Sequence, residues 1–140
     1  MASANVEIVQ KFISTCNTGD LDAAFTLLTD DATWSIAQRV RGVVMTKAEV
    51  RIRMGAMQAA LEEPLQLTPF SIIEQGNRLV VECESFAKTI EGKTYENKYC
   101  IFYSLENGKI TEVKEYNDSL HVTQVLIPAM EQARARSQGR

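Results

Sequence analysis

The stretch TYENKYCIFYSLENGKITEVKEYND, residues 94–118, decides the fold because it joins two long β-favouring segments through a very short turn. Residues 94–105 and 109–118 are rich in Val, Ile, Phe, Tyr and Thr, which favour extended strands. Between them, Asn107 and Gly108 form the typical dipeptide of a two-residue hairpin loop. The stretch therefore predicts two antiparallel strands near the end of the chain.

Two further strands are expected upstream of this hairpin. Residues 66–75 and 78–89 have the same composition, and turn residues separate all four segments. Residues 78–89 alternate between two sets, and we expect the more apolar set to face the interior while Glu82 and Glu84 face outward. The interior set comprises Leu79, Val81, Cys83, Ser85 and Ala87.

Helical periodicity dominates the first half of the chain. Apolar residues recur at helical spacing in residues 5–16 and 21–28, with a polar break between them at residues 17–20. Thr46 and Glu49 have the spacing of a capping box and open a third helix. Three helices followed by a meander of strands indicate an α+β fold, with the helices on one face of a curved antiparallel sheet.

We expect a single domain over residues 1–140, with a core that spans about residues 5–126. The segment after Ser119 is expected to be helical only as far as Pro128, because proline interrupts a helix. The polar tail, residues 129–140, is expected to be frayed.

Composition excludes several classes of function. The net charge of −3 and the pI near 5.2 argue against nucleic-acid binding, which needs a dense positive patch. No apolar run approaches the roughly 20 residues that span a bilayer, and no signal peptide is recognisable, so we expect no membrane partner and a cytoplasmic protein. Cys16, Cys83 and Cys100 are read as reduced core residues, and with one histidine no metal site is predicted.

Five short motifs are spread along the chain: GDL (19–21), DDATW (30–34), YENKY (95–99), NGKI (107–110) and EYNDSLH (115–121). Together they resemble the SnoaL-like branch of the nuclear transport factor 2-like superfamily, which includes ketosteroid isomerases, polyketide cyclases and limonene-epoxide hydrolases. The resemblance implies a cone-shaped α+β barrel, whose strongly curved sheet wraps around the helices and leaves a deep apolar cavity. It also implies a homodimer through the outer sheet face. It does not define the reaction, because one fold hosts many chemistries.

The resemblance implies a working aspartate at Asp118. A carboxylate in an apolar cavity has a raised pKa and can then take and give a proton near neutral pH. The alternative is that Asp118 caps the helix that begins near Ser119. If Asp118 points inward on a regular strand, Tyr116 shares its face and Glu115 points away, although a bulge would reverse this assignment.

Three polar residues complete the expected catalytic set. His121 is a candidate for carrying a proton or fixing a carbonyl group, and the alternative is a partly exposed helical histidine. Asn97 and Tyr99 alternate on one strand, and their amide and phenol groups are candidates for stabilising an oxyanion. Alternatively, Asn97 holds a neighbouring backbone and Tyr99 packs in the core.

The expected ligand contacts are mostly side chains that the wall of an apolar cavity needs. Arg39 is added because it lies near the expected mouth, where it would meet an anionic substrate, and solvation at the surface is its alternative role. The full set is Trp34, Phe12, Met54, Met57, Cys83, Ser85, Tyr116 and Arg39.

Three functions are compatible with these features. The first is a small cofactor-independent enzyme of the isomerase, cyclase or lyase type, in which Asp118 removes a proton next to a carbonyl of a small hydrophobic molecule. The second is a module that binds such a molecule without reaction, and the third is an interaction domain with a filled cavity. An epoxide hydrolase is disfavoured because Ser85 and Ala87 stand where the resemblance implies an Arg and an Asp.

Overall fold

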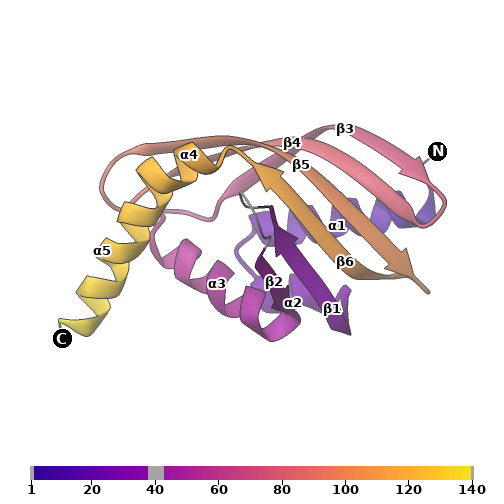
Figure 1. The fold of residues 1–140 in the computed structure, drawn as a ribbon, viewed down its shortest axis with the longest axis horizontal. Helices are drawn as coiled ribbons and strands as arrows, with labels where there is room; N and C mark the ends of the chain where they lie inside the picture. The colour runs from indigo at the N-terminus through magenta and orange to yellow at the C-terminus, as the bar shows by residue number, and fades with distance from the viewer. Residues whose placement is uncertain (1, 38–42, 140) are drawn as a thin grey trace.

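The computed structural model describes residues 2–37 and 43–139. Within these residues, six strands form one curved sheet, and helices fill its concave side (Figure 1). The elements are α1 (Ala4–Asn17), α2 (Leu21–Phe25), β1 (Leu28–Ile36), β2 (Val43–Thr46), α3 (Lys47–Ala59), β3 (Gln66–Gln75), β4 (Arg78–Lys88), β5 (Thr94–Glu106), β6 (Lys109–Asn117), α4 (Ser119–His121), the π-helical segment η1 (Val122–Leu126) and α5 (Ile127–Gln138). The predicted α+β fold is confirmed.

The order of strands in the sheet is β2-β1-β6-β5-β4-β3. Strands β3 to β6 form the predicted antiparallel meander, and the loop between β5 and β6 has a positive φ at both Asn107 (51°) and Gly108 (78°). Strand β1, however, pairs with β6 in parallel, with Trp34 opposite Val113. The predicted antiparallel meander is thus confirmed, and the parallel pairing of β1 is an addition that the prediction did not include. The sheet is also not closed, since β2 and β3 form its two edges.

The alternation along β4 places the two predicted faces correctly. Leu79, Val81 and Cys83 are fully buried on the concave side, where the core lies, whereas Glu82 and Glu84 are exposed on the convex side. A regular strand points successive side chains to opposite faces, so every second residue of β4 packs against the helices.

Helix α3 begins at the predicted capping box. The Thr46 hydroxyl accepts a hydrogen bond from the Glu49 backbone N–H at 3.2 Å, and the Glu49 carboxylate accepts one from the Thr46 N–H at 3.1 Å. These reciprocal bonds satisfy two backbone donors that a helix start leaves unpaired. One turn further on, Val50 of α3 is buried in the core.

The C-terminal segment differs from its prediction. Pro128 does not end the helical segment: α4, η1 and α5 follow one another without a break, and the π-helical η1 lies just before Pro128. The tail beyond it is helical rather than frayed. Ala129 is fully buried, and Leu126 and Met130 pack with Tyr95 and Leu61 in a second apolar cluster.

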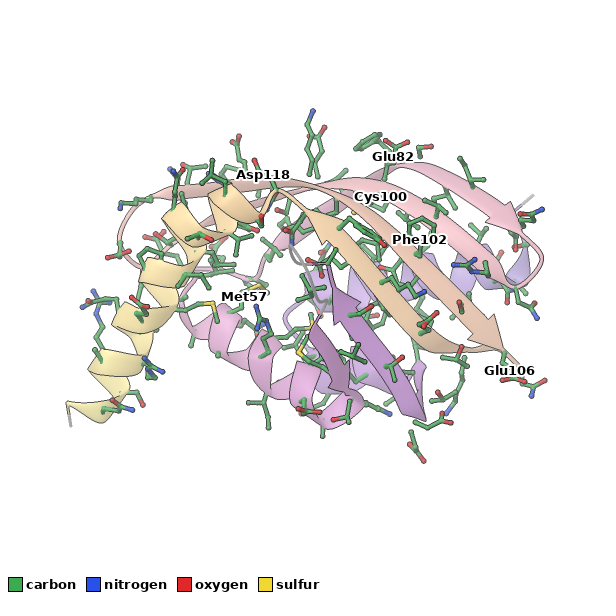
Figure 2. The ribbon with its side chains drawn as sticks, viewed as in Figure 1. Met57, Glu82, Cys100, Phe102, Glu106 and Asp118 are labelled. Carbon is green, nitrogen blue, oxygen red and sulfur yellow. The ribbon has the colours of Figure 1, made fainter. Side chains whose placement is uncertain are left out.

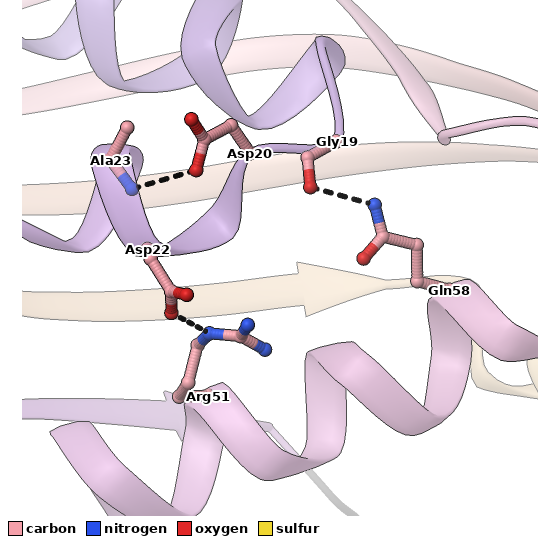
Figure 3. A network of polar contacts seen from close by, with 6 residues as sticks. All are labelled: Gly19, Asp20, Asp22, Ala23, Arg51 and Gln58. Carbon is pink, nitrogen blue, oxygen red and sulfur yellow. Dashed lines mark hydrogen bonds and ion pairs between the residues drawn. The ribbon is translucent and has the colours of Figure 1, made fainter.

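A turn between α1 and α2 lies next to α3 (Figure 3) and close to Pro64, which precedes β3. Gly19 has a φ of +87°, its carbonyl accepts a hydrogen bond from Gln58, and a Cβ atom there would lie 2.9 Å from the Pro64 side chain. In the same network, Arg51 pairs with Asp22 at 2.8 Å. The turn therefore requires glycine for its backbone conformation and also for space.

Replacing Gly19 by alanine is expected to lower the free energy of unfolding by about 2–4 kcal/mol, from the positive φ and from overpacking together. Gly92→Ala is the matched control, because Gly92 has a φ of +78° but no group of the described residues within 4 Å of the position that a Cβ atom would take. Urea denaturation of both variants measures the difference. Equal losses in the two variants would show that the contact with Pro64 and Gln58 is easily relaxed.

The convex face of the sheet carries exposed apolar side chains. Ile73, Phe86 and Tyr116 are each about half exposed or more, and Tyr116 contacts Phe102 edge to face. Cys100 is also on this face, half-buried, so it is not the core residue that the sequence suggested. The homodimer through this face stays a prediction.

Sedimentation velocity checks the expected dimer, whose mass would be twice 15.7 kDa. Tyr116→Lys places a charge in the centre of the expected interface and should shift the protein to monomer. Leu120→Lys is the control, because Leu120 is exposed on α4. A wild-type protein that stays monomeric at high concentration would rule this interface out.

Candidate active site

A cavity of about 240 Å³ lies between the concave face of the sheet, helices α1 and α3, and the C-terminal segment. Its wall is mostly apolar, and Figure 2 shows Met57 between α3 and the sheet. An apolar cavity of about 150 Å³ holds one benzene molecule, so this one has room for a ligand of about two rings. The expectation of a filled cone does not fit this geometry.

Four predicted ligand contacts do line the cavity: Phe12, Trp34, Met54 and Met57. Phe12 from α1 packs against Trp34 of β1 with their rings 6.0 Å apart, while the two methionines come from α3. Aromatic rings and thioethers give a wall that is apolar and adaptable in shape. This part of the predicted site is brought together by three different elements.

Glu115 of β6 is the one carboxylate in the cavity wall formed by the described residues. Strand β6 places Val113, Glu115 and Asn117 on its concave side, and Val113 is fully buried. The prediction that Glu115 points away was therefore wrong. Tyr116, which was expected to contact ligand, lies on the opposite face with Lys114.

Both oxygens of Glu115 are held by neutral donors. The Trp34 indole N–H donates to Oε1 at 3.3 Å, and the Asn117 amide donates to Oε2 at 2.7 Å. Burial raises the pKa of the Glu115 carboxyl above its ordinary value of 4.5, while these hydrogen bonds and the charge of Arg53 oppose the rise. Glu115 therefore has the two properties that were expected of Asp118, since its environment is apolar and its carboxyl is desolvated.

Asp118 lies at the junction of β6 and α4 (Figure 2), outside the cavity wall. It is exposed, and its carboxylate accepts hydrogen bonds from the backbone N–H groups of Leu120 and His121 at 3.1 and 3.4 Å. This is the alternative geometry, a helix N-cap. The structure corrects the expected placement of Asp118 in the cavity, because the strand directs odd-numbered residues inward here.

Tyr99 and Tyr95 bring two phenol groups to the cavity wall from β5. The two hydroxyl oxygens are 3.1 Å apart, the Ser85 hydroxyl is 2.9 Å from that of Tyr99, and the Asn97 amide donates to Tyr95 at 2.9 Å. Burial raises the pKa of both phenols, so both stay protonated and keep a proton to donate at neutral pH.

The strand register puts these hydroxyls on the same face as Glu115. In the β5–β6 pair, Tyr99 is opposite Asn117, and Ile101 is opposite Glu115. Tyr99 is thus a diagonal neighbour of Glu115, at a typical backbone separation of about 7–8 Å. A flat ligand between the two side chains can contact a carboxylate at one atom and a phenol at another.

Asn97 and His121 support the site from outside the cavity wall. Asn97 is buried and also exchanges hydrogen bonds with the backbone of Asp118, through its amide N–H (3.2 Å) and its carbonyl oxygen (3.1 Å). The His121 ring stacks on Tyr95 at 5.3 Å, and its Nε2 accepts a hydrogen bond from the Glu96 N–H. Both residues position the tyrosine pair, and neither has the expected place in direct contact with ligand.

The remaining predicted residues have other positions. Cys83 and Ser85 are buried behind the wall, Cys83 in the core and Ser85 under Tyr99. Arg39 lies outside the described residues. Arg53, which the sequence reading did not select, belongs to the wall.

Other reactive groups in the described residues do not suggest a different chemistry. Cys16 lines the cavity, but burial raises the pKa of its thiol to about 12, so it is protonated and a poor nucleophile at neutral pH. No group of three or more His, Cys, Asp or Glu side chains in the described part is arranged to hold a metal ion. Within the same residues, no helix has the length and apolar character that crossing a bilayer requires.

The chain matches a known protein family over most of its length. The family model of the SnoaL-like domain matches residues 9–113 of this chain. The chain belongs to the SnoaL-like domain family. The matched residues end two positions before Glu115. No curated protein matches the chain.

Solved structures show the same fold. TerC, co-crystallised with polyporic acid, has a TM-score of 0.77 and 18% sequence identity, and the match covers 89% of this chain and 99% of TerC. An NTF2-like protein of unknown function from Burkholderia pseudomallei K96243 has a TM-score of 0.78 and 20% sequence identity, and the match covers 89% of this chain and 98% of that protein. A putative SnoaL-like polyketide cyclase from Jannaschia sp. CCS1 has a TM-score of 0.74 and 13% sequence identity, and the match covers 88% of this chain and 91% of that protein. At these identities the likeness concerns the fold.

Proposed function

We propose that this SnoaL-like protein is an enzyme that moves a proton next to the carbonyl group of a small apolar ligand, without a cofactor. The observation that carries the proposal is the desolvated carboxylate of Glu115, which shares an apolar cavity with the phenols of Tyr95 and Tyr99. The SnoaL-like polyketide cyclase among the structural neighbours supports a role in small-molecule chemistry.

In the proposed reaction, the ionised Glu115 takes the proton from the carbon next to the carbonyl. The electron pair of the broken C–H bond forms a C=C bond, and the negative charge moves to the carbonyl oxygen. A phenol donates a hydrogen bond to this oxygen and stabilises the enolate. Glu115, now protonated, returns the proton to the same carbon or to another one, and return to another carbon gives an isomer.

Tyr99 is assigned the role of the donor. Tyr95 is 1% exposed, and its hydroxyl accepts a hydrogen bond from the Asn97 amide. Tyr99 is 9% exposed and is the diagonal neighbour of Glu115. While Tyr99 donates its single hydroxyl proton to the ligand, Tyr95 and Ser85 donate hydrogen bonds to the Tyr99 oxygen and orient it. The raised pKa of Glu115 brings its proton affinity closer to that of a carbon acid, which favours transfer in both directions.

Proton exchange tests the proposal without knowledge of the natural substrate. The probe is 2-tetralone, a bicyclic ketone whose size suits the cavity and whose protons next to the carbonyl are observable by NMR. In D₂O, the protein should replace these protons by deuterium faster than buffer does, and 2-naphthamide, which has no such protons, should inhibit competitively.

The two observables separate enzyme from binding module. Binding of 2-tetralone that 2-naphthamide displaces, with exchange at the buffer rate, would overturn the enzyme and favour the module that only binds. Exchange that 2-naphthamide does not inhibit would mean that the reaction occurs elsewhere on the protein.

A further inference from the structure

The cavity-facing side of α3 contains one residue that does not fit an apolar wall. Val50, Arg53, Met54, Met57 and Gln58 all line the cavity, and their spacing places them on one face of the helix. Four of these positions are apolar or use their polar group in the fold. Arg53 is the exception, because it brings a charged group to the cavity side of the helix and its side chain remains exposed to solvent.

The side-chain amides that line the cavity, unlike the guanidinium of Arg53, already have hydrogen-bond partners within the protein. Asn17 exchanges two hydrogen bonds with the backbone of Leu67, Gln58 donates to Gly19, and Asn117 donates to Glu115. None of the ion pairs formed by the described residues uses Arg53. The guanidinium therefore has no ion-pair partner among the described residues, and the Arg53 side chain lines the cavity while it is exposed to solvent.

We propose that Arg53 binds an anionic group of the ligand, so that the substrate is an apolar carbonyl compound that also carries a carboxylate or a similar anion. The inference rests on the proposed function for the identity of the cavity as the ligand site. A guanidinium presents two parallel N–H donors that match the two oxygens of a carboxylate. The rings occupy the apolar wall, and the carbonyl group lies near Tyr99 and Glu115.

The location of Arg53 also allows it to orient the ligand in the cavity. Its charge acts on Glu115, which lies in the same wall, so it is close to the reacting end of a small ligand. An anion held by Arg53 fixes the ligand in one direction along the cavity. A neutral ligand of the same shape can enter in either direction, and only one of them places its carbonyl group at Tyr99.

Two matched probes test the proposal by titration calorimetry: 2-naphthoate, which carries a carboxylate, and 2-naphthamide, its neutral counterpart of nearly the same shape. Arg53→Gln should weaken the binding of 2-naphthoate by about tenfold, which corresponds to the loss of one charge-assisted interaction that is partly open to solvent. The affinity for 2-naphthamide should change less than about twofold. The neutral probe thus reports that the variant is folded and its cavity intact.

Arg51→Gln is the matched control. Arg51 is on the same helix, its side chain pairs with Asp22 instead of lining the cavity, and the substitution removes the same charge. It should leave the affinity for both probes unchanged, whereas Arg53→Lys should retain part of the preference for 2-naphthoate because the charge remains.

Equal effects of Arg53→Gln on the two probes, or equal effects of Arg51→Gln and Arg53→Gln on 2-naphthoate, would overturn the proposal. These are binding measurements, so they stand whether or not 2-tetralone exchanges its protons. Failure of the exchange experiment with a normal preference for 2-naphthoate would reject the enzyme and keep the anion site. The converse result would keep the enzyme and reject the role of Arg53.

Discussion

Glu115→Gln is expected to lower the rate of proton exchange in 2-tetralone by about 10²- to 10⁴-fold, the usual contribution of a general base. An amide has nearly the shape of the carboxyl, but it cannot take a proton from carbon. The glutamine carbonyl can still accept from Trp34, and Asn117 can turn its amide to accept from the new NH₂ group. NMR of the exchanging protons measures the rate, and calorimetry with 2-naphthamide confirms that the cavity is intact.

Asp118→Asn is the matched control for this variant. Asparagine caps a helix about as well as aspartate, so both the fold and the exchange rate should be retained. Loss of exchange in Asp118→Asn, with activity kept in Glu115→Gln, would return the catalytic role to Asp118, as the resemblance first implied.

The pH dependence follows from the direction of the shift. The pKa of Glu115 is raised by burial, and only the ionised carboxylate acts as a base. The exchange rate of the wild type should therefore increase with pH through a value above 4.5 and then level off, and the profile of Glu115→Gln should be flat. The folded protein holds this proton more tightly than the unfolded chain, so the ionisation of Glu115 lowers stability as the pH rises through its pKa. The glutamine variant does not carry this cost and should fold at neutral pH.

Tyr99→Phe is expected to lower the same exchange rate by about 10²- to 10³-fold, as loss of an oxyanion donor does in other enzymes. The hydroxyls of Ser85 and Tyr95 each lose a partner, so we also expect a loss in stability of about 1–3 kcal/mol. Tyr95→Phe removes a hydroxyl from the same network at a more deeply buried position and serves as the matched control. Its rate should fall much less than that of Tyr99→Phe.

A purely structural role for Tyr99 predicts different measurements. It would lower stability and the affinity for 2-naphthamide in both phenylalanine variants, with similar exchange rates once the protein is saturated with ketone. Equal rates in saturated Tyr99→Phe and Tyr95→Phe would therefore reject the assignment of Tyr99 as the donor.

Local signals in the sequence were sufficient for most of the fold. Asn107 and Gly108 specify a hairpin through their own backbone preferences, and the capping box at Thr46 acts within one helical turn. The parallel pairing of β1 with β6 has no local signal, because it joins segments that are far apart in the chain. The prediction for Pro128 was wrong because proline disfavours a helix interior without always ending the helix, and here the helical segment continues through it directly after the π-helical η1.

The site was harder to predict, although one signal for Glu115 was present. Val113 is strongly apolar and lies two residues before Glu115, so both were to be expected on the inner face of one strand. Asp118 was preferred because of the family resemblance, but the strand ends just before it and its carboxylate serves the next helix. Arg53 lies beside the apolar stripe of Val50, Met54 and Met57 on α3, and the sequence alone does not distinguish it from a solvent-facing residue.

The central place of β6 also has a consequence for the synthesis of the protein. The hydrogen bond from Trp34 to Glu115 joins residues that are 81 apart in the chain, so an emerging polypeptide cannot form it until nearly all of the domain has left the ribosome. Without β6, the sheet would separate into a β1–β2 pair and a β3–β5 unit, and the N-terminal helices would be left with apolar surface uncovered. The nascent chain thus places the Glu115 carboxylate in the same step that completes the cavity wall around it.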